Sequence, residues 1–256
     1  MRTRFIVIAA LSLVLVAALA IGATMAFLTD TKEAENIFTV GKLTLALAEP
    51  DYPSPAPSNN APGDSFPKNP TVTAAKGNGF MRVTVEYIDL DTDARITDAA
   101  RLAQIWETIY YTPDYESARP GSPALPLDTD GKNAPAQLQK TEAQLSALTA
   151  QGMAEKFNTA SFAKDMARSE PGLDFYNYSK SGTQLPGADP VDDIFLEGAS
   201  AVLFNSIVIP SDWGEAEFAL LGRYKIVIRA EAIQADNFGS AAAAFTALDT
   251  ELTKAG

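Results

Sequence analysis

The sequence of 256 residues contains no cysteine and no histidine. Without cysteine the chain forms no disulfide and has no thiolate nucleophile, and without histidine it has no Ser-His-Asp triad. A zinc site built on thiolate or imidazole ligands is excluded for the same reason. These absences remove the most familiar hydrolase and zinc-protein classes. We therefore expect no catalytic residues, no metal and no cofactor.

Basic side chains are also scarce, since 20 Lys and Arg stand against 32 Asp and Glu, for a net charge of −12. No segment concentrates enough positive charge to follow a phosphate backbone, which argues against nucleic acid as a partner. The hydrophobic fraction of 46% is ordinary for a folded protein. Together with the length, this fraction predicts a single domain with a sizeable core rather than a disordered chain.

The N-terminus has the layout of a secretory signal. Arg2 and Arg4 precede an uncharged, hydrophobic run over residues 5–29 that contains small residues near its end. This pattern predicts a signal helix over residues 1–26, cleaved between Ala26 and Phe27. An uncleaved anchor is the alternative, because the run is long enough to span about 30 Å of hydrocarbon. We favour cleavage, since no basic cluster follows the run, and the membrane is then a partner only before cleavage.

Alternating hydrophobic and polar side chains predict that the rest of the chain is mainly β. The predicted strands lie in residues 36–49, 81–89, 175–178, 201–209 and 223–234. Residues 50–70 contain seven prolines, which remove backbone donors and fix φ. That segment is therefore predicted to be a loop or an extended connection.

Helical spacing replaces the strand pattern in three places. The stripes are Leu102, Ile105, Trp106 and Ile109; Leu138, Leu145 and Leu148; and Phe245, Leu248 and Leu252. The third predicts a C-terminal helix over residues 240–253 with Ser240 as its N-cap. The first two lie in residues 92–195, which we interpret as a variable, partly helical insertion. Core packing explains Trp106 and its neighbours Tyr110 and Tyr111 better than a ligand-stacking site does.

Two acidic runs, residues 89–93 and 128–131, are similar to calcium-binding loops. The first has Ala94 where such a loop requires glycine, and the second has Gly131 too early in the loop. Turn formation is the better explanation for both, and for the acidic residues near 189–193. No spacing ties two carboxylates to one pocket, so no catalytic pair is assigned.

The residues on either side of the predicted cleavage site carry a family resemblance. The sequence Ala-Phe-Leu-Thr-Asp over residues 26–30, followed by Asn-Ile-Phe-Thr-Val-Gly over residues 36–41 and an alternating strand, resembles the start of the TasA/camelysin family. Residues 62–70, 203–210 and 230–238 agree with that family as well. The resemblance covers residues 1–90 and 195–238 and is missing from the middle of the chain.

The resemblance implies an exported protein of a Gram-positive-type bacterium, processed by a SipW-type signal peptidase. It implies that residues 27–256 form an antiparallel β-sandwich of jelly-roll type, found outside the cell or on its surface. Members of the family are often subunits of biofilm-matrix fibres whose N-terminal strand completes a neighbour's sheet. Some relatives are called camelysin, a metalloendopeptidase. The absence of histidine argues against that activity here.

These observations lead to a structural hypothesis in which the chain associates with itself or with related fibre subunits. The segment from residue 27 to about residue 49 would add to a neighbour's sheet as a strand. Its alternate apolar side chains would fill pockets there: Phe27, Ile37, Phe38, Leu43, Leu45 and Leu47. The alternative is that this strand pairs within its own domain. Two further alternatives are an extracellular endopeptidase and a surface adhesin whose residues 92–195 bind a host or glycan ligand.

Overall fold

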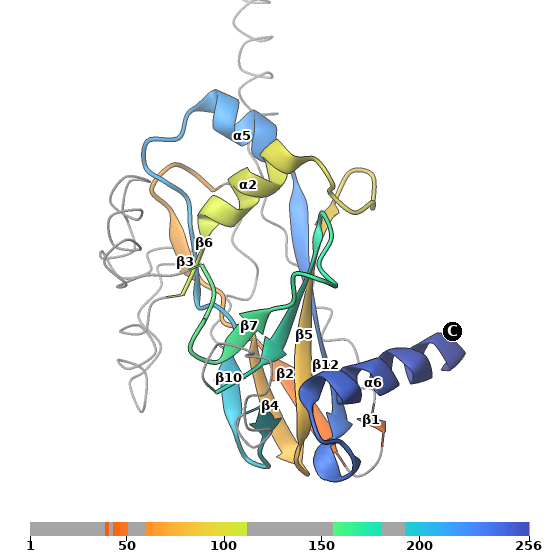
Figure 1. Ribbon diagram of the computed structural model, residues 1–256. Helices are drawn as coiled ribbons and strands as arrows, with labels where there is room; N and C mark the ends of the chain where they lie inside the picture. Colours follow the sequence, from red (N-terminus) through yellow and green to blue (C-terminus); the bar gives the residue numbers. More distant parts are fainter. Residues whose placement is uncertain (1–38, 41–42, 51–59, 112–155, 181–192, 256) are drawn as a thin grey trace, which may run out of the picture.

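The computed structural model describes residues 39–40, 43–50, 60–111, 156–180 and 193–255. Within these ranges the chain is mainly β, with antiparallel sheets and three α-helices (Figure 1). No helix of the described ranges is long and apolar enough to cross a bilayer. The predicted signal helix, its cleavage site and the helical stripe at Leu138 lie outside the described residues.

The larger sheet is built on two long antiparallel strands that pair along their whole length. In spatial order it contains β1 (Thr39–Val40), β12 (Tyr224–Gln234), β5 (Gly79–Asp89), β8 (Leu173–Tyr178) and β7 (Phe162–Lys164), and β9 (Ile194–Phe195) pairs with the start of β5. Only β1 runs parallel to its neighbour. The strands predicted from alternation at residues 81–89, 175–178 and 223–234 are confirmed.

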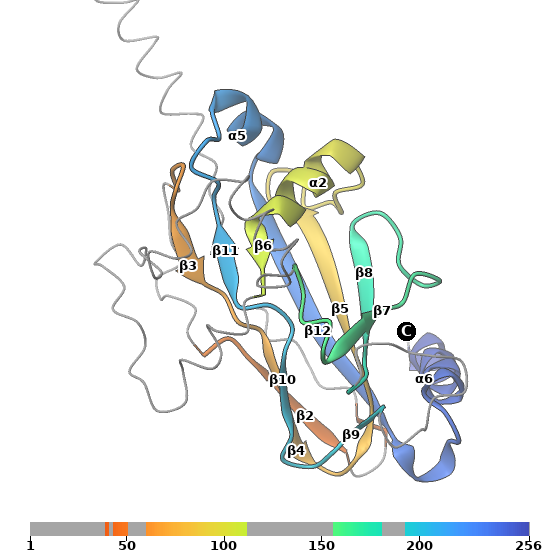
Figure 2. The ribbon, with the colours of Figure 1, turned by 60° about the vertical axis from the view of Figure 1, so that its left-hand side comes forward.

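Two smaller sheets lie across the larger one and act as a single ribbon (Figure 2). One has the order β10 (Ser200–Val202), β4 (Thr71–Lys76) and β2 (Thr44–Ala48), and the other has the order β3 (Ser65–Pro67), β11 (Ser206–Val208) and β6 (Ile109–Tyr110). The pairing of β3 with β11 continues the pairing of β4 with β10 without a shift in register. Two backbone hydrogen bonds cross the break, from Lys68 N to Asn205 O and from Leu203 N to Pro70 O.

One hydrophobic core joins the three sheets. Phe66 of β3, Val83 of β5 and Ile207 of β11 are completely buried in it, together with Ile105 from the helix above. This burial follows from the alternation of the strands, because every second side chain of a strand faces the same side. Phe157, just before β7, belongs to the same core, so residues of the predicted insertion contribute to it.

Three helices cover the ends and the outer face of the sheets (Figure 1). α2 (Ala99–Thr108) begins at Asp98, whose side chain accepts a hydrogen bond from the backbone of Arg101. α5 (Glu215–Leu221) packs beside α2. α6 (Ala241–Ala255) follows the 3-10 turn η2 (Ala235–Asn237), and Ser240 Oγ accepts from its third residue, as predicted for an N-cap. Phe245 of α6 lies against the outer face of the larger sheet.

Several predictions about the secondary structure were wrong. The described part of the strand predicted over residues 36–49 is two strands, β1 and β2, which belong to different sheets. Residues 65–67 lie in the proline-rich segment yet form β3, because a proline is tolerated in a strand at the edge of a sheet. Ile109 belongs to β6 rather than to the helix before it. The segment 201–209 contains two short strands instead of one, and α5 follows residue 214, where no helix was predicted.

Candidate functional site

A short N-terminal stretch of chain completes the edges of two sheets, and we call its described residues, 39–40 and 43–49, the seam segment. In β1, Thr39 and Val40 pair in parallel with Ala232 and Ile233 at the end of β12. A few residues later β2 pairs with β4 in antiparallel fashion, on the opposite layer. The seam segment therefore takes part in both the larger sheet and the ribbon formed by the smaller ones (Figure 1).

The side chains of the seam segment alternate as the sequence predicts. Leu43 and Leu45 are 2% and 3% exposed in the main core, and Leu47 is half-buried against it. Ala46, between the leucines, is exposed. Three of the predicted strand-donor side chains thus share one face, and in this structure they fill the core of their own chain. The other three, Phe27, Ile37 and Phe38, lie outside the described residues.

A missing side chain at Gly79 creates the site that receives Leu43. A Cβ atom at Gly79 would collide with Cδ2 of Leu43 and with the carbonyl group of Ile233. Gly79 begins β5 and pairs with the residue that follows Ile233. The glycine is therefore required by the close approach of the seam segment to the end of β12, and it makes a notch for one particular leucine.

An ion pair fastens the far end of the seam segment. Nζ of Lys68 lies 2.8 Å from Oε1 of Glu49, and the two side chains are only 3% and 17% exposed. Lys68 sits at the break between β3 and β4. Leaving a buried ammonium group without its carboxylate partner costs free energy. The pair therefore favours the observed register of β2 against β4 over registers shifted by one or more residues.

Among the described residues, most of one edge of β12 is not paired with a strand. β12 pairs with β5 over eleven residues, but among the described residues a strand pairs with its other edge only at Ala232 and Ile233. In an antiparallel ladder, alternate residues direct their N–H and C=O groups away from the partner strand. Residues 224–231 therefore present backbone donors and acceptors along that edge, which is a template for a further strand.

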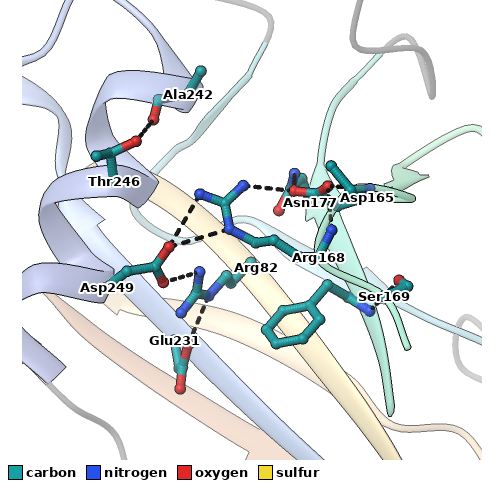
Figure 3. A network of polar contacts seen from close by, with 11 residues as sticks. Arg82, Asp165, Arg168, Ser169, Asn177, Glu231, Ala242, Thr246 and Asp249 are labelled. Carbon is teal, nitrogen blue, oxygen red and sulfur yellow. Dashed lines mark hydrogen bonds and ion pairs between the residues drawn. The ribbon is translucent and has the colours of Figure 1, made fainter. Parts of the chain in front are cut away.

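A network of arginine and carboxylate side chains ties α6 to the larger sheet (Figure 3). The guanidinium group of Arg82 lies 2.7 Å from Glu231 and 2.6 Å from Asp249 of α6. Arg168 lies 3.0 Å from Asp249 and 2.8 Å from Asp165. Burial raises the pKa of Asp165, but hydrogen bonds from Arg168 and Asn177 lower it by more, so the net pKa is below its usual value. Each of these carboxylates has an arginine partner, which suits fastening rather than acid-base chemistry.

The acidic run at residues 89–93 forms a turn. Oδ1 of Asp89 accepts hydrogen bonds from the backbone of Asp91 and Thr92 and from the Thr92 hydroxyl group, and its other oxygen pairs with Arg101. Its carboxylate is thus occupied by turn and ion-pair contacts. In the described part of the chain, no three acidic side chains cluster as metal ligands. The second acidic run, at residues 128–131, lies outside that part.

Comparisons with protein-family models, with curated proteins and with solved structures give no match to this chain. The interpretation of the site therefore depends on the geometry of the seam segment. Alternation identified the leucines of that segment from the sequence. It did not identify the notch at Gly79 or the partner of Glu49, because both depend on which strands become neighbours. A glycine directly before the long alternating run at residues 80–89 was the available signal for the notch.

Proposed function

We propose that this chain is an exported structural subunit that assembles by β-strand addition, with its N-terminal residues as the added strand. The observation that carries the proposal is the seam segment, which completes the edges of both layers within one short stretch of chain. Such an edge strand is held by backbone hydrogen bonds and a few side-chain anchors. The same segment of another copy can make the same contacts.

The anchors along the seam segment define the register of an incoming strand. Leu43 enters the notch at Gly79, Leu45 fills the core, and Glu49 meets Lys68. A shift by one residue would turn both leucines toward solvent and separate the ion pair. A neighbour's strand is therefore accepted in one position, which a regular fibre requires.

The edge of β12 that no described strand pairs with extends the proposed acceptor site beyond the seam segment. A strand that continues β1 backwards in the same parallel register places residues 31–38 beside residues 224–231. Paired residues on adjacent strands face the same side of a sheet. In the assembled protein Ile37 then lies beside Ala230 and faces the main core. Phe38 lies beside Glu231, on the face that α6 covers.

In this proposal, export and assembly are linked. A SipW-type signal peptidase removes residues 1–26, and the new N-terminus at Phe27 belongs to the strand that is donated. The acceptor is a β-sandwich of jelly-roll type, located on the cell surface or in the extracellular matrix, and partners are further copies or related fibre subunits. The resemblance of residues 26–30 and 36–41 to the TasA/camelysin family supports this proposal.

Electron microscopy of purified protein tests the proposal. The protein that begins at Phe27 is expected to form fibres, whereas a variant without residues 27–38 is expected to stay monomeric. A second variant replaces residues 27–38 by a Gly-Ser sequence of equal length, which separates the role of the side chains from that of chain length. Undiminished fibres in both variants would refute strand donation.

A further inference from the structure

A cavity of about 510 Å³ opens between α2 and the hairpin of β7 and β8. Small-molecule sites have volumes of roughly 300–1,000 Å³, with mostly apolar walls and a few placed polar groups. The walls of this cavity include Leu102 and Trp106 of α2 and Met166 of the hairpin loop. Trp106 packs against the core as predicted, but it is only partly buried there, and it also lines the cavity. Met166 is 74% exposed, so its side chain is accessible to a ligand at the rim of the cavity. We call this cavity the Trp106 pocket.

The charged groups of the Trp106 pocket neutralise each other. Nζ of Lys164 lies 2.7 Å from Oδ1 of Asp174 and 4.1 Å from the centre of the Trp106 ring. Asp174 is 7% exposed and Lys164 is 26% exposed. Burial raises the pKa of Asp174, although the hydrogen bond from Lys164 opposes this shift. Glu170, also on the wall, pairs with Arg95. A ligand with a net charge would therefore lack a counter-charge in this pocket.

The polar groups keep hydrogen-bonding capacity after these contacts. An ammonium group has three hydrogens, and Lys164 directs one to Asp174 and one to the face of Trp106. The carboxylate of Asp174 has about four acceptor positions. One accepts from Lys164 and one, at 3.5 Å, accepts from the Tyr87 hydroxyl group, so others are left. Ser169 Oγ accepts from the backbone of Phe175, which leaves its hydrogen to donate. Donors and acceptors thus lie side by side.

We propose that the Trp106 pocket binds a neutral hexopyranose unit of a glycan. Adjacent sugar hydroxyl groups each donate and accept, so they match the Lys164 and Asp174 pair, while the C–H face of the ring packs on Trp106, Leu102 and Met166. A neutral sugar brings no unmatched charge into the cavity. This assignment goes beyond strand addition, because the pocket lies within residues 102–174 and uses no residue of the seam segment.

The two tryptophans of the chain provide a site-specific readout. Trp106 lines the pocket, whereas Trp213 is 5% exposed and packs against Phe218. In a nitrogen-proton correlation spectrum each gives one indole signal, and W106F assigns them. Methyl β-D-glucopyranoside, methyl α-D-mannopyranoside and methyl N-acetyl-β-D-glucosaminide are the probes. At least one is expected to shift the Trp106 signal saturably, with a Kd of about 1 mM, and to leave the Trp213 signal in place.

Variants and charged sugars decide whether the pocket itself binds. The K164Q/D174N protein keeps the neutral balance but loses the ammonium and carboxylate groups, and it is expected to weaken binding at least tenfold. M166S, at an exposed position, is expected to weaken binding several-fold without affecting the fold, and K76Q on β4 is the matched control that leaves binding unchanged. D-glucosamine and D-glucuronate are expected to bind at least fivefold more weakly than the best neutral probe.

Three results would overturn the assignment. The first is the absence of a saturable Trp106 shift with every neutral probe in protein that is folded by circular dichroism. The second is binding that neither K164Q/D174N nor M166S weakens. The third is equal or tighter binding of a charged sugar. All measurements use monomeric full-chain protein, so a failure here leaves fibre assembly untouched, and a failure of fibre assembly leaves this result untouched.

Discussion

Truncation of Leu45 tests how the seam segment is held. Leu45 is the second residue of β2, is 3% exposed, and pairs with Ala74 of β4. Leu45→Ala removes three side-chain carbons from the main core and leaves the backbone pairing possible. Leu47, two residues later on the same face, is only half-buried. Leu47→Ala is therefore a matched control in the same strand.

The expected loss of stability follows from burial. Truncating a buried leucine to alanine costs about 2–5 kcal/mol, because a cavity adds to the lost transfer free energy. The contacts of Leu45 join two layers that cannot easily collapse onto the space, so we expect about 3 kcal/mol. Leu47→Ala removes the same atoms from a half-buried site and should cost about 1 kcal/mol. Against a typical stability of about 5–15 kcal/mol, the first change is large.

Equilibrium unfolding in urea, followed by far-UV circular dichroism, measures both variants. The midpoint of Leu45→Ala should fall well below that of Leu47→Ala, with no change in the slope of free energy against urea concentration. Equal effects of the two truncations, or a loss below about 0.5 kcal/mol for Leu45→Ala, would contradict the placement of β2 in the core.

Three further predictions concern other parts of the molecule. Gly172 (φ 79°) and Gly198 (φ 80°) both have a left-handed backbone, but a Cβ atom at Gly172 would collide with the chain at residue 96, whereas one at Gly198 would meet nothing. Gly198→Ala should therefore lose only the roughly 1–2 kcal/mol of backbone strain, and Gly172→Ala should lose well over that amount in urea unfolding. Equal losses of stability in the two variants would refute the collision. Burial raises the pKa of Asp89, but hydrogen bonds from Arg101 and Thr92 lower it by more, so that the net pKa is about 2. The folded-state pKa lies below the unfolded value, so these contacts stabilise the fold above pH of about 4, and the stabilisation is lost as the pH falls toward 2. Asp89→Asn should remove that part of the pH dependence in denaturant titrations, and an unchanged profile would contradict it. Ile37→Asp should prevent fibre formation under the electron microscope while the circular dichroism of the monomer stays the same, and normal fibres would disprove the parallel register proposed along β12.

The parts of the fold that the sequence predicted are those in which one local pattern decides the structure. β5 and β12 are eleven residues long and alternate over most of that length, and the stripe of α2 repeats at helical spacing. Ser240 and the apolar residues after it define the start of α6 in the same local way. The secondary structure of such long periodic segments can be predicted without knowing which elements pack against them.

The missed elements depend on tertiary context. Pro67 opposes a strand assignment by itself, and only its place at a sheet edge beside Ser206 makes β3 possible. α5 is seven residues long, too short for a clear hydrophobic stripe, and Glu217 stabilises its start by accepting from the backbone of Gly214. The seam segment was predicted as one strand because its alternation cannot reveal that its two parts join different sheets.

The central claim, that the seam segment is exchanged between copies, can be tested by disulfide cross-linking. The chain has no cysteine, and Ala46 of β2 pairs with Thr73 of β4 away from the core. Directly paired residues in an antiparallel ladder have Cβ atoms about 4.5–5.5 Å apart, which is close enough for a disulfide after a small shift. A46C and T73C are therefore introduced into separate chains, and the doubly substituted chain is the control for pairing within one copy.

The two single variants are mixed, allowed to assemble and oxidised, and the products are separated by non-reducing gel electrophoresis. Strand exchange predicts a disulfide-linked dimer of one A46C chain and one T73C chain in the assembled fraction, and no such dimer in the monomer fraction. A cross-link that forms only within the doubly substituted chain, and never between the two single variants in assembled material, would contradict the account.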